Sequence, residues 1–214
     1  MAYPTVSAPY GLKPINLIGG QVFAGQTRDL PITTSSVNYN TAIFNGDIVE
    51  LASTGTVVKS AIQDESSPTA GLIGVFVGCS YTNPSTNQKI FAQYWPGAAS
   101  GITDAVAYVV DDPDALFKVV LVASDVENST NALTPAYLGQ TVVGSNVTVV
   151  QNTGSTVTGD SKIGVYTPGG AGTASTPMRV VDVVPDTANS SGNFCELIVK
   201  FNFGYHSYYN ATGV

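Results

Sequence analysis

The chain has 214 residues, of which 43% are hydrophobic and only 11% are charged, and its formal net charge is -7. Its eight basic residues are scattered rather than clustered, which argues against a nucleic-acid partner and against an anionic membrane surface, because both attract concentrated positive charge. A surface with so little charge suits a protein that packs against other protein subunits, since each buried charge carries a desolvation cost.

The first 41 residues predict an extended arm. They contain Pro4, Pro9, Pro14 and Pro31 with apolar and aromatic residues between them, a pattern that favours neither a long helix nor a central strand. The opening residues also lack the basic region and apolar run of a secretory signal, and no window approaches the length of a membrane-spanning helix. We therefore expect a protein that is made and kept in a cytosol.

Residues 42–125 predict a β-rich body. Short runs of Val, Ile, Phe and Tyr are bounded here by Gly, Asn, Asp and Pro, which is typical of strands joined by tight turns. Residues 47–62 predict a hairpin that turns at Thr54 and Gly55. Trp95, near the end of a later strand, is expected in the core. The other strands expected in this range are residues 72–81, 90–95, 105–110 and 118–123, with a capped turn over residues 111–117.

A second β-rich unit is expected at residues 126–201, and it could belong to the same domain as the first; it opens with a connection that contains Asn and Ser, before strands resume near residue 140. Thr134 and Pro135 predict a short helical turn that ends near Gly139. Strands are expected at residues 147–151, 156–158, 162–167, 178–185 and 194–203, which brings the total to about eleven. The sequence thus predicts an all-β fold with a β-barrel or sandwich body.

Residues 202–214 predict an aromatic C-terminal tail with almost no charge. Aromatic side chains bury a large area with few rotatable bonds, and they are therefore frequent anchors of protein interfaces. The alternative is a tail that folds back onto the core of its own chain, and the sequence does not decide between the two. The candidate contact residues at the two ends of the chain are Tyr10, Leu12, Ile15, Phe23, Tyr205, Tyr208 and Tyr209.

Tests for catalytic and metal-binding patterns are mostly negative. His206 is the single histidine, which argues against a metal site built from several imidazoles, and there is no Gly-x-Ser-x-Gly motif for a nucleophilic serine. Asp111, Asp112 and Asp114 could ligate Ca²⁺, but they lack the spacing and the closing Glu of an EF-hand loop, and a turn rich in Asp is the commoner explanation. We therefore expect no enzyme activity, no cofactor and no bound metal.

Several segments in the first half of the chain resemble a group of small virion proteins of tailed bacteriophages. The resemblance spans a little over half of the chain. The group consists of capsid cement or decoration proteins, which are encoded near the major capsid protein in phages of aquatic bacteria. The segments that carry the resemblance are APYGLKP (8–14), LIGGQ (17–21), FAG (23–25), FNGDIVEL (44–51), GVFVGCSY (74–81), QYWPG (93–97) and VVDDPDALF (109–117).

This resemblance implies a virion structural protein that is added to the outer surface of the capsid shell after synthesis in the host cytoplasm. There it would stabilise the shell by bridging neighbouring capsomers. The implied partners are the major capsid protein and further copies of the chain, as a dimer or trimer on a local symmetry axis. The resemblance implies no catalysis.

Two other classes of function stay open. A carbohydrate-binding module of a phage head or tail fibre would use the same residue types, with aromatic rings stacked on sugars and Asn, Asp and Gln bonded to their hydroxyl groups. A β-sheet hydrolase with a pair of carboxylates ranks third, because the sequence offers no recognisable activated nucleophile.

Overall fold

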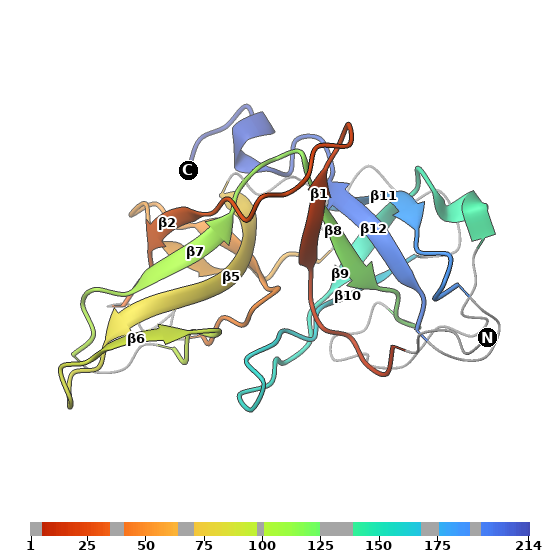
Figure 1. Ribbon diagram of the computed structural model, residues 1–214. Coiled ribbons are helices and arrows are strands. Elements are labelled where there is room, and N and C mark those ends of the chain that lie inside the picture. The colour runs from red at the N-terminus through yellow and green to blue at the C-terminus, as the bar shows by residue number, and fades with distance from the viewer. Residues whose placement is uncertain are drawn as a thin grey trace.

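The all-β fold class is confirmed by the computed structural model, which describes residues 6–34, 41–63, 71–97, 101–124, 139–167, 176–188 and 194–214. Two antiparallel sheets of six strands each form a sandwich (Figure 1). Two short 3-10 helices, η2 (Gly139–Val142) and η3 (Ser207–Tyr209), complete the elements seen in these ranges. None of the helices in the described residues is long and apolar enough to cross a membrane.

The first sheet has the strand order β1-β8-β12-β11-β9-β10, so it combines both ends of the chain with its middle. Its central strands alternate apolar and polar residues or are buried throughout, as expected for a sheet that covers a core. The strands are β1 (Lys13–Leu17), β8 (Ala115–Val120), β12 (Glu196–Phe201), β11 (Met178–Val183), β9 (Asn146–Val150) and β10 (Gly164–Tyr166).

The second sheet has the order β2-β7-β5-β3-β4, and β6 also pairs with β5. β5 is the longest strand of the described chain, and it curves through the sheet so that β3 pairs with its first half and β6 with its second half (Figure 1). The strands are β2 (Arg28–Pro31), β7 (Val106–Val110), β5 (Leu72–Thr82), β3 (Ile48–Leu51), β4 (Val57–Lys59) and β6 (Lys89–Ala92).

The largest buried cluster joins the two sheets. Ile48 and Val75 of the second sheet belong to the same cluster as Phe117, Val149 and Leu197 of the first sheet. A second cluster lies around the aromatic rings of Phe76 and Trp95, and it confirms the core position expected for the tryptophan. Both faces of β5 are therefore covered, which explains its nearly continuous apolar sequence.

Close backbone packing accounts for a glycine near the start of β5. Leu72 and Val75 belong to the first cluster and Phe76 to the second. At Gly74, between them, an added Cβ would lie 2.1 Å from the carbonyl oxygen of Val110 in β7. The absence of a side chain at this position is thus a condition for the pairing of β5 with β7.

The N-terminal segment expected to be an arm, residues 1–41, contributes strands to both sheets. Within its described residues, β1 pairs with β8 and β2 pairs with β7, each as an edge strand. The sequence interpretation took the prolines as evidence against a long helix and a central strand, and it expected an extended arm instead. Pro14 and Pro31 both lie in these edge strands, where one unpaired side of the strand tolerates a residue without an N–H.

The expected division near residue 125 does not separate the two sheets. β8 belongs to the predicted body 42–125, but it lies in the sheet that holds the strands of the predicted unit 126–201. The expected strand at residues 156–158 is a turn, and β9 pairs with β10 across the longer loop 151–163. Most of the connection between the two units, with the helical turn expected at Thr134, lies outside the described residues.

Candidate interaction surfaces

The structure places the candidate contact residues of the N-terminal segment in or against the core. Leu12 is fully buried in the largest cluster, so it cannot contact another subunit. Tyr10 is half-buried and its hydroxyl donates a hydrogen bond to Glu196 at the start of β12. Ile15 in β1 is half-buried, and Phe23 packs against the first cluster.

The residues of the C-terminal tail are divided between the core and the surface. Tyr205 is fully buried in the first cluster, which excludes it as a contact to another subunit. Tyr208 and Tyr209 in η3 are 45% and 41% exposed, as a surface contact requires. The sequence interpretation missed Phe203, whose side chain is 82% exposed, although it lies among the aromatic residues that were considered.

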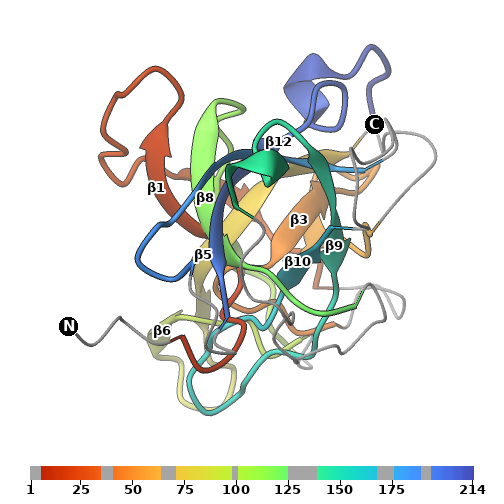
Figure 2. The same ribbon diagram turned by 90° about the vertical axis from the view of Figure 1, so that its right-hand side faces the viewer.

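A second exposed apolar segment lies at the same end of the molecule. Leu17, the last residue of β1, pairs with Ala115, the first residue of β8, and β12 runs antiparallel to β8. The turn after β1 and the chain after β12 therefore leave the sheet at one end, as both views show at the top (Figures 1 and 2). We define the aromatic end by its exposed apolar side chains, Ile18, Val22, Phe203, Tyr208 and Tyr209.

Specific contacts hold the rings of the aromatic end in place. The ring centroids of Phe203 and Tyr209 are 6.0 Å apart, with an interplanar angle of 23°. The hydroxyl of Tyr208 donates to Asp111 Oδ2 at 2.6 Å, and the Arg28 side chain binds the same oxygen at 2.9 Å. Burial, with the hydrogen bond to Asp111, raises the pKa of the Tyr208 hydroxyl to about 12. This end is thus an ordered surface with its rings already positioned.

His206 lies buried beneath these rings. Its ring packs edge-on against Phe201 of β12, and its Nδ1 accepts a hydrogen bond from the backbone N–H of Tyr208 at 3.3 Å. Burial lowers the pKa of His206 below its ordinary value, although the nearby Asp111 and Asp112 act in the opposite direction. The neutral imidazole is therefore the form that the folded aromatic end contains near neutral pH.

We expect the protein to lose stability below about pH 6.5 in a way that depends on this histidine. The pKa of His206 is lower in the folded protein than in the unfolded chain, so the unfolded chain binds the proton first as the pH falls. The contribution of this residue to the free energy of unfolding is therefore fully present above the unfolded pKa. It is lost progressively as the pH drops towards the folded pKa. The slope from one group is at most about 1.4 kcal/mol per pH unit.

His206→Asn tests this expectation, because asparagine keeps a hydrogen-bond acceptor for the Tyr208 N–H but does not titrate. The free energy of unfolding of both proteins is measured in urea between pH 7.5 and pH 5. The wild type should lose more stability than the variant over this interval. Parallel pH profiles would contradict the assigned role of the histidine.

The opposite end of the molecule exposes two further apolar side chains. Phe91 in β6 is 74% exposed, and Val157 in the loop between β9 and β10 is 93% exposed. Both segments lie at the bottom in both views (Figures 1 and 2). Gln93, just after β6, donates to Asp160 Oδ1 at 3.0 Å, which connects the two segments. We call Phe91 and Val157 the loop end.

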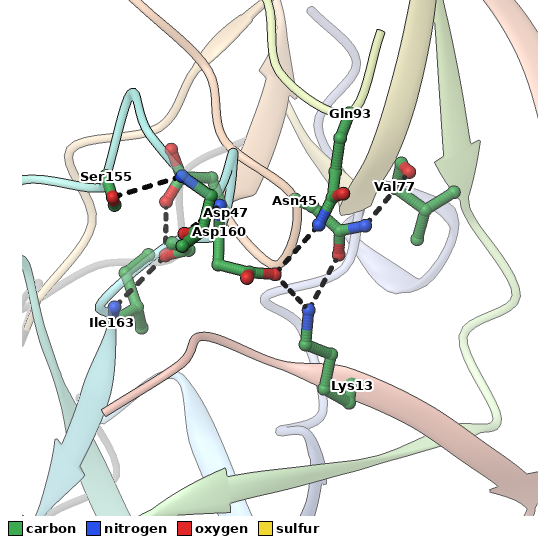
Figure 3. A network of polar contacts seen from close by, with 10 residues as sticks. Lys13, Asn45, Asp47, Val77, Gln93, Ser155, Asp160 and Ile163 are labelled. Atoms are coloured by element: carbon green, nitrogen blue, oxygen red, sulfur yellow. Dashed lines mark hydrogen bonds and ion pairs between the residues drawn. The ribbon is translucent and has the colours of Figure 1, made fainter. Parts of the chain in front are cut away.

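A polar network joins the loop end to both sheets (Figure 3). Lys13 Nζ in β1 lies 2.9 Å from Asp160 Oδ1 and donates to Asn45 Oδ1 at 3.1 Å. The Asn45 side chain in turn donates to the carbonyl oxygen of Val77 in β5 at 3.2 Å. These contacts tie the loop after β9 to β1 of the first sheet and to β5 of the second sheet.

Asp47 forms the buried part of the same region. Its carboxylate is fully buried, with Lys59 Nζ at 3.0 Å, the backbone N–H of Phe44 at 2.9 Å and the hydroxyl of Ser161 at 2.5 Å. The Ser161 hydroxyl also accepts from the backbone N–H of Ile163. Both oxygen atoms of this carboxylate have partners within the protein. The group therefore stabilises the fold and is not presented to solvent as a free acid or base.

The three aspartates considered as a Ca²⁺ site bind separate partners. Asp111 pairs with Arg28, and Asp114 pairs with Lys200 at 3.1 Å. Asp112 Oδ1 accepts from the backbone N–H of Asp114 at 2.8 Å, which is the turn expected from the sequence. Over the described ranges, no three His, Cys, Asp or Glu side chains gather in a group that could hold a metal ion.

Comparisons with known proteins found no matching family model, no similar curated protein and no similar solved structure. The resemblance to phage decoration proteins therefore stays a prediction from the sequence.

Proposed function

We propose that this chain is a virion structural protein, a capsid cement or decoration protein that binds the outer surface of the shell and bridges neighbouring capsomers. One observation carries the proposal: exposed apolar residues lie on segments at two opposite ends of a single sandwich, as the ribbon views place those segments (Figures 1 and 2). A protein that binds one partner needs one such surface, whereas a protein that bridges two subunits needs two that are well separated.

The energetics favour attachment through the aromatic end. Fully burying a large apolar side chain is worth about 1.5–3 kcal/mol, and the rings here are already ordered by their contacts with one another and with Asp111. The loop end is smaller and would contribute a weaker contact to the next subunit. Because the same contacts recur at every site of a shell, a modest affinity for each copy would still stabilise the whole assembly.

The major capsid protein is the proposed partner, and self-association as a dimer or trimer is proposed with it. The virion surface is the corresponding location. This proposal includes no catalytic step, no nucleic acid and no membrane. It draws support from the low charge of the chain, since few charged groups would have to be desolvated when subunits pack together.

Co-sedimentation of the purified protein with undecorated capsids tests the proposal. We expect saturable binding at a fixed ratio to the major capsid protein. The double variant Phe203→Ser with Tyr209→Ser should weaken binding at least about tenfold, because it removes two exposed rings from the aromatic end. Phe203→Tyr is the matched control, since it keeps the ring and should bind like the wild type.

Two results would contradict the proposal. The first is the absence of saturable binding to capsids, which would direct attention to the carbohydrate-binding alternative. The second is unchanged binding by the double variant, which would show that the aromatic end is not the attachment surface. The midpoint of thermal unfolding is measured for each variant, so that a loss of binding is not confused with a loss of folding.

A further inference from the structure

The amine of Lys13 lies between a neutral carboxamide and a carboxylate (Figure 3). Its Nζ is 2.9 Å from Asp160 Oδ1 and 3.1 Å from Asn45 Oδ1. The three residues come from β1, from the segment before β3 and from the loop between β9 and β10. The fold thus brings together a nucleophile, an acyl group with a leaving group, and a group that can carry a proton.

The carbonyl group of the Asn45 side chain faces the amine. Nδ2 donates to the carbonyl oxygen of Val77 at 3.2 Å, and because that partner can only accept, Oδ1 is the atom turned towards Lys13. Cγ is bonded to Oδ1, so it lies no more than about 4.3 Å from Nζ. A small rotation of the lysine chain therefore brings the two atoms to the roughly 3–3.5 Å from which attack occurs.

Backbone hydrogen bonds keep the reacting groups together. The N–H of Asn45 donates at 3.0 Å to the carbonyl oxygen of Gly159, the residue before the aspartate. The N–H of Leu12, the residue before Lys13, donates at 3.0 Å to the carbonyl oxygen of Gly46, the residue after the asparagine. Groups held in this way react far faster than the same groups free in water, because the entropy of bringing them together is lost once, on folding.

Asp160 suits the role of proton carrier better than that of acyl group. Its Oδ1 accepts hydrogen bonds from Lys13 at 2.9 Å and from Gln93 at 3.0 Å, as an ionised carboxylate does. An amine attacks a carboxylate anion poorly, whereas a carboxamide is neutral and can release ammonia. The side chains of Lys13 and Asp160 are 32% and 34% exposed, so the pair is largely withdrawn from water. A proton can therefore pass directly between the two groups.

We propose that Lys13 and Asn45 form an intramolecular amide bond in the folded protein, with Asp160 as the proton carrier. Asp160 takes a proton from the Lys13 ammonium group, and the neutral Nζ attacks Asn45 Cγ. The Nζ–Cγ bond forms, the Cγ–Nδ2 bond breaks, and Asp160 passes its proton to Nδ2, which leaves as ammonia. The ammonia takes up the second proton that Nζ loses. The products are one amide bond and one ammonium ion, and no oxidant or other reagent is needed.

This bond joins the two sheets covalently. Lys13 lies in β1 of the first sheet, and Asn45 precedes β3 of the second sheet. The bond closes a loop that contains β2, and it therefore restricts the unfolded chain as a disulfide does. In a protein that bridges subunits it also keeps β1 in its sheet under load. The inference itself does not depend on attachment to a capsid.

Mass spectrometry of the intact full-length chain tests the proposal. After incubation of the folded protein, its mass should be lower than the sequence mass by one molecule of ammonia. Trypsin cleaves after Arg28, and the fragments on its two sides, which hold Lys13 and Asn45, should stay joined. Asp160→Asn should form the bond at least about a hundredfold more slowly, because it lacks the proton carrier.

Lys13→Arg should keep its full sequence mass, because the guanidinium group stays protonated and does not act as a nucleophile. Lys89→Arg is the matched control. Lys89 also lies 3.0 Å from a carboxylate, that of Asp104, but it is outside the network of Lys13, so this variant should lose ammonia like the wild type. The midpoint of thermal unfolding shows whether each variant is folded, while the mass of the wild type decides the proposal by itself.

A second reaction at Asn45 also releases ammonia and must be distinguished. Attack by the backbone nitrogen of the next residue, Gly46, gives a cyclic imide, although in the folded chain this N–H donates to the carbonyl oxygen of Phe76 at 2.8 Å. The imide joins no fragments and does not need Lys13. The proposal is overturned if the wild type keeps its sequence mass, if the fragments separate after cleavage, or if Lys13→Arg loses ammonia equally. Joined fragments that have lost water instead of ammonia would assign the bond to Asp160 and would also overturn it.

Discussion

A chain that lacks residues 1–34 is expected not to fold. This deletion removes β1 and β2, so β8 and β7 lose their hydrogen-bonded neighbours in the two sheets. It also removes Leu12 from the core, and the loss of one buried leucine side chain alone costs about 2–5 kcal/mol. Since the whole stability of a domain is about 5–15 kcal/mol, the combined loss should exceed what the remaining contacts supply.

Circular dichroism and thermal unfolding measure this outcome. The truncated chain should show no cooperative transition, whereas a control that begins at Val6 keeps both strands and should unfold like the full chain. An extended arm would give the opposite result, because an arm can be removed without loss of the body. A cooperative transition in the truncated chain would therefore restore the interpretation of residues 1–41 as an arm.

Asp47→Ala is expected to lower the free energy of unfolding by about 3–5 kcal/mol. The substitution removes the acceptor for the Phe44 N–H and the Ser161 hydroxyl, and it leaves the largely buried ammonium group of Lys59 without its partner. Removing one member of a buried pair costs far more than the net value of the pair, because the other charge stays desolvated.

Asp104→Ala is the matched control for this prediction. Asp104 pairs with Lys89 at the same distance of 3.0 Å, but both side chains are more than 40% exposed, so its removal should have a much smaller effect. Urea unfolding of both variants at neutral pH provides the comparison. Equal losses in the two variants would show that Asp47 contributes no more than an ordinary surface ion pair.

Strands with a clear local sequence pattern, above all those that pair with the next strand along the chain, were the predictable part of the fold. The hairpin of β3 and β4 follows from the alternation of Val49 and Leu51 with Glu50, together with a turn at Gly55, whose φ of 75° suits glycine. β5, predicted as residues 72–81, spans Leu72–Thr82. Local side-chain pattern and turn chemistry were sufficient in these cases, because a hairpin needs no information from distant residues.

The candidate surfaces could be predicted only in part. Exposed Tyr208 and Tyr209 agree with a surface role for the tail, but Tyr205 in the same tail is buried while Phe203 is exposed. Composition cannot distinguish these residues, because outside a regular strand or helix no fixed period relates position to burial. Val22 was also missed, since its exposure depends on where the turn after β1 leaves the sheet.

By itself the sequence determined the all-β class, most of the strand positions and the low charge of the surface, because these depend on the properties of each residue and its near neighbours. Only the tertiary structure decided that β1 and β2 complete the two sheets and that the turn after β1 and the tail leave the first sheet at the same end. It alone brought the amine of Lys13 to the side chains of Asn45 and Asp160. These arrangements join residues distant in sequence, and the energy of such contacts is set by the complete fold rather than by any local pattern.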